Sequence, residues 1–149
     1  MSGKSSFTEA LVLDLIFKAT TDATLASAAG SLTTIYAALH TADPTDSGNQ
    51  TSNEVTTGQY ATYARVGIAR SGAGWVRTGS SISPVSAINF PTTSSVGTGC
   101  TATHFSLGTA SSGAGNLLYA GTITPAIVIP ATTAGVVPQL TTATSVTEG

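Results

Sequence analysis

The sequence contains a long stretch without formal charge: no Asp, Glu, Lys or Arg occurs from Thr78 through Thr147, almost half of the 149-residue chain. A free monomer normally distributes charges of both signs over its surface to remain soluble. A charge-free half indicates either a surface that other subunits cover or one that dense Thr and Ser side chains hydrate. The first interpretation predicts a protein built for assembly, and the second a Thr-rich secreted β domain.

The overall composition narrows the function classes. Charged residues make up 8% of the chain, against about 25% in an ordinary soluble domain. The five Lys plus Arg residues cannot form the basic stripe that a nucleic acid or an anionic membrane surface requires. The 41% hydrophobic content is enough for one core, and the length predicts a single domain overall. Cys100 has no second cysteine to pair with, which fits assembly in a reducing cytoplasm.

The N-terminal segment predicts a helical arm. Ser6 to Glu9 form a capping box, and the residues from Phe7 to about Thr20 favour a helix. Apolar residues occur on almost every side of this helix, so a small β domain cannot cover all of them and a second partner is implied. The predicted contacts with that partner are Phe7, Leu11, Leu15 and Ile16.

The same segment is not predicted to be an export signal. Asp14 and Lys18 interrupt its apolar run, and at this spacing they can form an ion pair on the helix surface. We expect residues 1–31 to form a helical arm and linker, followed by a β-sandwich over residues 32–149.

The β prediction depends on short runs of alternating side chains. In the first run Ile35, Ala37 and Leu39 share one face, and Tyr36 and His40 share the other. Glycine, proline and asparagine separate the runs, as in a jelly-roll-like antiparallel β-sandwich. The further predicted strands are Tyr60–Arg70, Trp75–Thr78, Val85–Phe90, Thr101–Leu107, Asn116–Thr124, Ala126–Ile129, Gly135–Leu140 and Thr141–Val146.

Two segments could be mistaken for functional motifs. The sequence Ser-Gly-Ala-Gly occurs at Ser71–Gly74 and Ser112–Gly115, and we interpret both copies as hairpin turns. A phosphate-binding loop would need a following helix and usually a lysine. The uncharged stretch from Leu117 to Val137 could span a bilayer by length, but Pro125 and Pro130 divide it into strand-length pieces. We therefore predict no membrane segment.

No residue constellation predicts catalysis, a metal or a cofactor. His40 and His104 are the only histidines that could act as a base, and neither lies near a nucleophile and carboxylate pattern. The loop after His40 lacks the alternating carboxylates of a calcium site, so Asp43 and Asp46 are interpreted as turn residues. Trp75 and the four tyrosines could stack on sugars or bases, but at strand spacing they favour core packing.

Several motifs resemble a family of small virion proteins of tailed phages. The resemblance covers most of the chain after Leu32. Its motifs are Leu39 to Gln50, Asn53 to Val55, Tyr63 to Val66, Ala87 to Pro91, Thr103 to Ala110 and Ser112 to Gly115. Family members are often labelled tail-fibre proteins, whereas the helical arm and the β domain resemble the cement, or decoration, proteins of short-tailed phage capsids.

The resemblance implies a structural virion protein without catalytic activity. It would assemble in the host cytoplasm, bind the capsid exterior and bridge neighbouring major capsid subunits, as a dimer or trimer. The shell would then resist the pressure of packaged DNA, because extra buried area raises the free energy of separating its subunits. Two alternatives remain: a tail-fibre or receptor-binding module, and a secreted Thr-rich adhesin-like domain. The sequence has neither the coiled-coil heptads of a fibre nor the disulfides of an adhesin.

Overall fold

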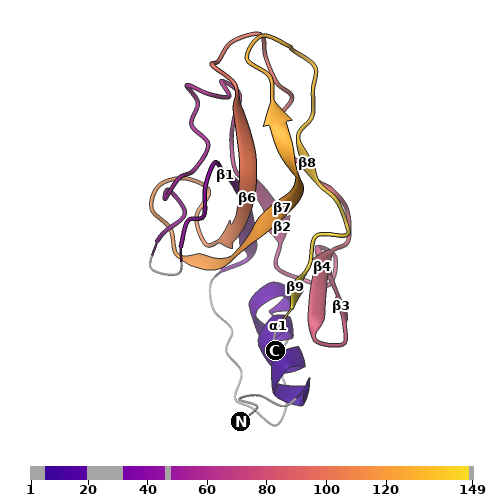
Figure 1. The fold of residues 1–149 in the computed structure, drawn as a ribbon. Helices are drawn as coiled ribbons and strands as arrows, with labels where there is room; N and C mark the ends of the chain where they lie inside the picture. The colour runs from indigo at the N-terminus through magenta and orange to yellow at the C-terminus, as the bar shows by residue number, and fades with distance from the viewer. Residues whose placement is uncertain (1–5, 20–31, 46–47, 148–149) are drawn as a thin grey trace. The chain divides into compact units, whose positions relative to one another are not determined.

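The described part of the chain is mainly β, with one helix near the N-terminus (Figure 1). The computed structural model describes residues 6–19, 32–45 and 48–147, with helix side chains from Val12 onward. The described elements are α1 (Ser6–Lys18), β1 (Thr34–His40), β2 (Val66–Ala69), β3 (Trp75–Thr78), β4 (Ser81–Pro84), β5 (Ile88–Asn89), β6 (Cys100–Gly108), β7 (Leu117–Ile129), β8 (Gln139–Leu140) and β9 (Val146–Thr147). No helix in this part of the chain combines the length and apolar character that a membrane span needs.

The strands form three sheets, in the orders β2-β1-β6-β7, β3-β4-β9 and β5-β8. The neighbours β1 and β6, β6 and β7, β3 and β4, and β4 and β9 are antiparallel. The prediction of a mainly β, antiparallel fold with an N-terminal helix is confirmed. The jelly-roll order of connections stays a prediction.

The strand boundaries differ from the predicted runs in several places. Strand β3 has the predicted bounds, and β1 and β6 lie close to theirs, whereas Ser81–Pro84 forms a strand that we did not predict. Only Val66–Ala69 of the predicted run Tyr60–Arg70 is a strand, because residues 60–62 belong to a turn and residues 63–65 form no regular structure. The remaining short runs, in the regions of β5, β8 and β9, are reduced to two-residue strands.

Strand β7 replaces the two strands predicted on either side of Pro125. Thr122 pairs with His104 and Ile127 pairs with Ala102, so the residues between them form a bulge opposite one residue of β6. Because β7 is an edge strand, Pro125 interrupts no ladder between two neighbours. The proline therefore modifies the strand without ending it.

The two Ser-Gly-Ala-Gly turns have different roles. Ser112–Gly115 connects the antiparallel strands β6 and β7, so the predicted hairpin is confirmed, and Gly113 has the positive φ of 72° that favours glycine. Ser71–Gly74 connects β2 to β3, which belong to different sheets, so the hairpin prediction is wrong there. Gly74 is required in that turn by space, since a Cβ would lie 2.2 Å from the carbonyl oxygen of Ala69.

The described chain divides into two compact units. Unit 1 comprises Met1–Ile35, Ile68–Ala87 and Leu140–Gly149, and unit 2 comprises Tyr36–Gly67 and Ile88–Gln139. Strands β1 and β2 each begin in one unit and end in the other. The linker predicted up to residue 31 lies outside the described residues.

In unit 1, helix α1 packs on the small sheet through its last two turns. Leu13 and Phe17 are completely buried, and the Phe17 ring meets the Trp75 ring edge-on, with centroids 4.5 Å apart. Such a pair adds to the stabilisation that the buried area itself provides. This side of the helix is therefore part of the core of unit 1.

Two arginines fix the same helix. Arg70 donates hydrogen bonds to the carbonyl oxygens of Leu15 and Ile16, in the last turn, where carbonyls lack helical partners and a cation is favoured. Arg77 forms a 2.9 Å ion pair with Asp14, which also accepts from Lys18 at 3.3 Å, as its i,i+4 spacing predicts. The helix is consequently bound by both packing and charge within its own unit.

Candidate functional site

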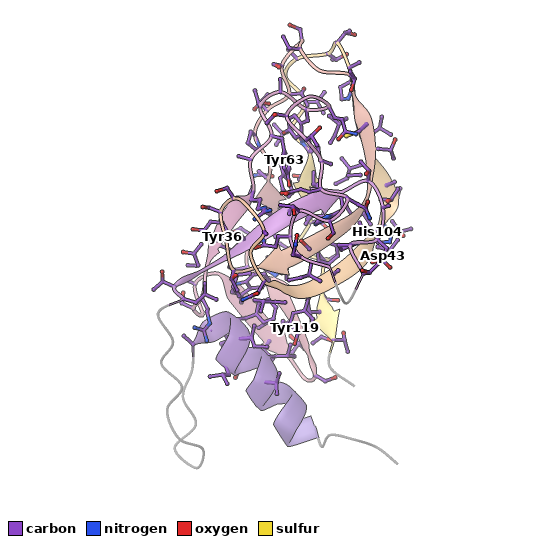
Figure 2. All side chains as sticks on the ribbon, turned by 90° about the vertical axis from the view of Figure 1, so that its left-hand side faces the viewer. Tyr36, Asp43, Tyr63, His104 and Tyr119 are labelled. Atoms are coloured by element: carbon purple, nitrogen blue, oxygen red, sulfur yellow. The ribbon has the colours of Figure 1, made fainter. Side chains whose placement is uncertain are left out.

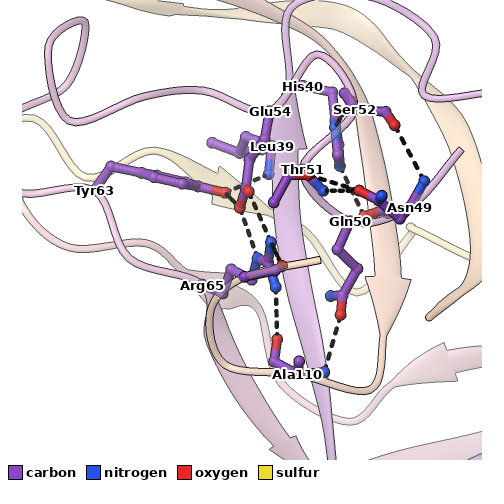
Figure 3. A network of polar contacts seen from close by, with 12 residues as sticks. Leu39, His40, Asn49, Gln50, Thr51, Ser52, Glu54, Tyr63, Arg65 and Ala110 are labelled. Carbon is purple, nitrogen blue, oxygen red and sulfur yellow. Dashed lines mark hydrogen bonds and ion pairs between the residues drawn. The ribbon is translucent and has the colours of Figure 1, made fainter. Parts of the chain in front are cut away.

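The most organised polar site in unit 2 is built around a buried ion pair (Figure 3). Arg65 binds both carboxylate oxygens of Glu54, through Nε and Nη2, at 2.7 Å each. The Arg65 side chain is 2% exposed and that of Glu54 14%. Arg65 also donates to the carbonyl oxygens of Ala110 (2.9 Å) and Gly113 (2.8 Å), in the β6–β7 hairpin. We call this arrangement, with Leu39, Gln50 and Tyr63, the Glu54–Arg65 network.

Tyr63 connects the ion pair to strand β1. Its hydroxyl donates to Glu54 at 2.9 Å and accepts from the backbone N–H of Leu39 at 3.1 Å. Burial, reinforced by the neighbouring Glu54 carboxylate, raises the pKa of Tyr63 far above its ordinary value. Tyr63 is therefore a neutral hydrogen-bond donor at every physiological pH.

Gln50 completes the network from the other side of the hairpin. It is fully buried, and its Oε1 accepts from the backbone N–H of Ala110 at 2.9 Å. Its amide is enclosed by two glycines: a Cβ at Gly108 would lie 2.2 Å from Cδ of Gln50, and one at Gly115 would lie 2.4 Å from Oε1. These glycines leave the space that the buried side chain occupies.

His40 forms a second polar contact between strands. The ring is fully buried, with Nδ1 2.8 Å from the carbonyl oxygen of Ser52 and Nε2 2.7 Å from the hydroxyl of Ser106. A carbonyl only accepts, so Nδ1 carries the proton and the Ser106 hydroxyl donates to Nε2. Burial lowers the pKa of His40 and favours this neutral form. Ser106 is also fully buried, so the pair cannot meet a substrate in this conformation.

The neutral His40 predicts a pH-dependent stability. Above pH 6.5 the ring is neutral in both folded and unfolded chains, so the contribution is fully present. As the pH falls below 6.5, the unfolded chain takes up a proton that the folded chain resists, and the free energy of unfolding decreases. Urea unfolding at several pH values should show this loss in the wild type.

A matched pair of variants isolates the His40 contribution to that prediction. In His40→Gln the decrease between neutral and mildly acid pH should become smaller, whereas His104→Gln keeps the His40 contribution. An equal decrease in the wild type and in His40→Gln would contradict the assignment of the effect to His40.

A surface hollow of about 480 Å³ lies over the Glu54–Arg65 network. The hydrogen bonds of Glu54 and Arg65 are directed mainly to each other and to the hairpin, and most of the exposed lining of the hollow is apolar. Its lining residues are Thr51, Glu54, Val55, Thr56, Thr57, Tyr63, Ala64, Arg65, Ser111, Ser112 and Gly113. In the described residues, no three His, Cys, Asp or Glu side chains gather as metal ligands would.

The aromatic residues and turn residues take structural positions. Tyr63 packs against Tyr60 and Phe90, with ring centroids 5.7 and 6.3 Å away, and Figure 2 shows Tyr36 and Tyr119 elsewhere in unit 2. They therefore form no common stacking platform. Asp43 accepts from the backbone N–H of Thr45 at 2.9 Å, which confirms the predicted turn. The predicted turn at Asp46 lies outside the described residues.

The four predicted partner contacts are only partly described. Leu15 and Ile16 are half-buried, while the side chains of Phe7 and Leu11 lie outside the described part of helix α1. The structure brings together instead the motif residues His40, Gln50, Glu54 and Arg65, which the sequence analysis had not connected. In the sequence these four residues occur in neighbouring motifs. Nothing in the motifs indicates which of the residues contact one another.

The comparisons with known proteins identify a relationship over almost the whole chain. The model of a family described as "Podophage GP4 fiber I protein gp80" matches residues 3–144. A search of curated proteins finds no match.

Proposed function

The chain belongs to the podophage GP4 fiber I protein gp80 family and is thus a structural virion protein of a short-tailed phage; on this premise, we propose that it is a capsid cement protein. In this role it binds the capsid exterior and bridges neighbouring major capsid subunits. Burial of additional surface across the subunit boundaries stabilises the shell against the pressure of packaged DNA.

The observation that carries this proposal is the uncharged surface. The described residues from Thr78 to Thr147 include exposed valines, among them Val96 and Val128 at 67% and 68% exposure, and no charged side chain. A surface of this kind is stabilised by being covered in an assembly. The resemblance of the helical arm and the β domain to capsid cement proteins supports the choice of the shell as the partner.

Helix α1 provides a second contact surface in this proposal. Its Leu13 and Phe17 are held in the core of unit 1, so the described apolar residues left to extend a contact with another chain are the half-buried Val12, Leu15 and Ile16. The protein acts as a homo-oligomer and performs no catalysis. The burial of both His40 and Ser106 supports a structural role for the contact between their side chains.

A tail-fibre module is the second candidate function. The printed description of the matching family, a fiber protein, favours it. In that case the same uncharged surface would be covered by other fibre subunits, and the protein would lie at the tail and not over the shell.

Copy number distinguishes the two functions. A cement protein covers the shell, so we expect its number of copies per virion to be comparable with that of the major capsid protein. Quantitative mass spectrometry of purified particles measures this ratio, and imaging locates the density. A ratio far below that of the major capsid protein, with density confined to the tail, would contradict the cement proposal and support the fibre.

Salt and one helix variant test how the protein is held on the particle. Uncharged contacts should resist a change from about 0.05 to about 1 M salt, which screens ion pairs between exposed groups.

Leu15→Asp should lower the copies retained per particle, because it places a charge in an apolar contact. Val76→Asp, at a half-exposed position of β3 in the same unit, is the control. Equal retention of both variants, with unchanged folding by circular dichroism, would remove the helix from the interface.

A further inference from the structure

The surface hollow over the Glu54–Arg65 network is large enough for a small molecule. Its volume of about 480 Å³ falls within the range of small-ligand sites, about 300–1,000 Å³. The lining comes from three segments of unit 2, within residues 51–57, 63–65 and 111–113. A ligand in the hollow would therefore contact the hairpin between β6 and β7 and two segments that precede β2.

Hydrogen bonds within unit 2 hold the lining segments in place. Arg65 binds the carbonyl oxygens of Ala110 (2.9 Å, Figure 3) and Gly113 (2.8 Å), so the hairpin is fixed from the interior of the unit. The backbone N–H of Val55 donates to the carbonyl oxygen of Leu39 at 2.9 Å and fixes the second segment to β1. A site that is formed before its ligand arrives loses little conformational freedom on binding.

The charged groups of the hollow leave an acceptor open and balance each other in charge. Oε1 of Glu54 accepts from both Tyr63 and Arg65, whereas Oε2 accepts from Arg65 alone among the described residues. A carboxylate oxygen can accept two hydrogen bonds, so Oε2 keeps a position for a donor of the ligand. Because the Arg65 side chain is 2% exposed and paired with Glu54, an anionic ligand finds no free cation here. The hollow therefore favours an uncharged ligand that carries hydrogen-bond donors.

The remaining lining combines hydroxyl groups with apolar surface. Thr57, Ser111 and Ser112 are exposed, and each hydroxyl can both donate and accept a hydrogen bond. Most of the exposed lining is nevertheless apolar. A ligand that matches both kinds of surface carries several hydroxyl groups around a ring whose faces present C–H groups.

We propose that this hollow is a binding site for a neutral saccharide of one or two rings. The sugar hydroxyls donate to Oε2 of Glu54 and exchange hydrogen bonds with Thr57 and Ser112, while a C–H face of the ring covers the apolar lining. The site lies on the surface, so part of the sugar stays hydrated and the affinity is low. It is built from unit 2 alone, and the inference does not depend on whether the protein covers the shell or belongs to the tail.

Titration of the ¹⁵N-labelled full chain with glucose, lactose and maltose, followed by NMR, tests the site. Backbone amide shifts should saturate at millimolar sugar and be largest in residues 51–57, 63–65 and 111–113. Two further probes test the chemistry. Sorbitol has the hydroxyl groups but no ring, and glucuronate brings a carboxylate close to that of Glu54, so each should bind about tenfold more weakly than glucose or worse.

A double variant tests whether the hydroxyl groups recognise the sugar. Thr57→Val with Ser112→Ala keeps the shape of the hollow and removes two hydrogen-bonding groups, so the Kd for lactose should rise about tenfold or more. The matched control is Ser95→Ala with Thr132→Val, at exposed positions of the same unit outside the lining, and it should leave the Kd unchanged. Urea unfolding checks that both variants are folded.

Three results would overturn the inference. The first is the absence of saturable shifts with all three neutral sugars, or shifts concentrated outside the lining segments. The second is binding of sorbitol or glucuronate as tight as that of glucose. The third is a Thr57→Val, Ser112→Ala variant that binds lactose like the wild type. Failure of the cement proposal is a separate result, because it is measured on particles.

Discussion

Glu54→Ala is expected to lower the free energy of unfolding by about 3–5 kcal/mol, because it leaves the Arg65 guanidinium buried without a counter-charge. The effect should be large since the Arg65 side chain is 2% exposed and binds both oxygens of Glu54. The variant also removes an acceptor of the Tyr63 hydroxyl. Urea unfolding at neutral pH measures the loss.

Two further variants make this test specific. Asp43→Ala removes an exposed carboxylate from the same loop region and should cost about 1 kcal/mol or less, the value of one hydrogen bond. Glu54→Leu combined with Arg65→Met removes both charges and should recover part of the loss. If Glu54→Ala costs no more than Asp43→Ala, the ion pair does not stabilise the fold as described.

Phe17→Ala is expected to cost about 3–5 kcal/mol, the range for a fully buried aromatic residue replaced by alanine. The ring is completely buried and contacts Trp75, the single tryptophan of the chain. Removing it leaves a cavity between helix α1 and strand β3. The emission of Trp75 should therefore shift together with the loss of stability, since solvent reaches the indole more easily.

Ile16→Ala is the control for this prediction. Ile16 is adjacent in sequence but only half-buried, so its replacement should cost clearly less and leave the Trp75 emission unchanged. Unchanged emission and unfolding in Phe17→Ala would show that the helix does not pack on Trp75 in solution.

The sequence predicted those elements in which the alternation or spacing of the side chains indicates the structure directly. Alternation located β1 and most of β6, and the spacing of Asp14 and Lys18 predicted their ion pair. The run Tyr60–Arg70 was misread because its aromatic and apolar residues also suit a strand. In the structure Tyr63 and Arg65 lie in the irregular segment between a turn and β2, where they bind Glu54.

The Glu54–Arg65 network could not be predicted because its partners are distant in sequence. Arg65 binds carbonyl oxygens of Ala110 and Gly113, and backbone groups leave no mark on sequence patterns. The burial of Ser106 could not be predicted either. Alternation with Phe105 and Leu107 places Ser106 on the polar face with His104, but in the structure Ser106 is buried and contacts His40. Only the antiparallel register of β1 and β6 brings these residues together.

The arginines make contacts within the chain, and this affects the rate at which the protein associates with a partner. Arg65, Arg70 and Arg77 are the three arginines of the chain, and each binds groups within it. Because each guanidinium already binds an acceptor within the chain, little positive charge is left to steer encounters, and association should proceed at the unsteered rate of about 10⁵–10⁶ M⁻¹s⁻¹. At micromolar concentration each site then waits about one second or longer for a productive collision. Occupancy of the virion is therefore decided by how long each copy remains bound.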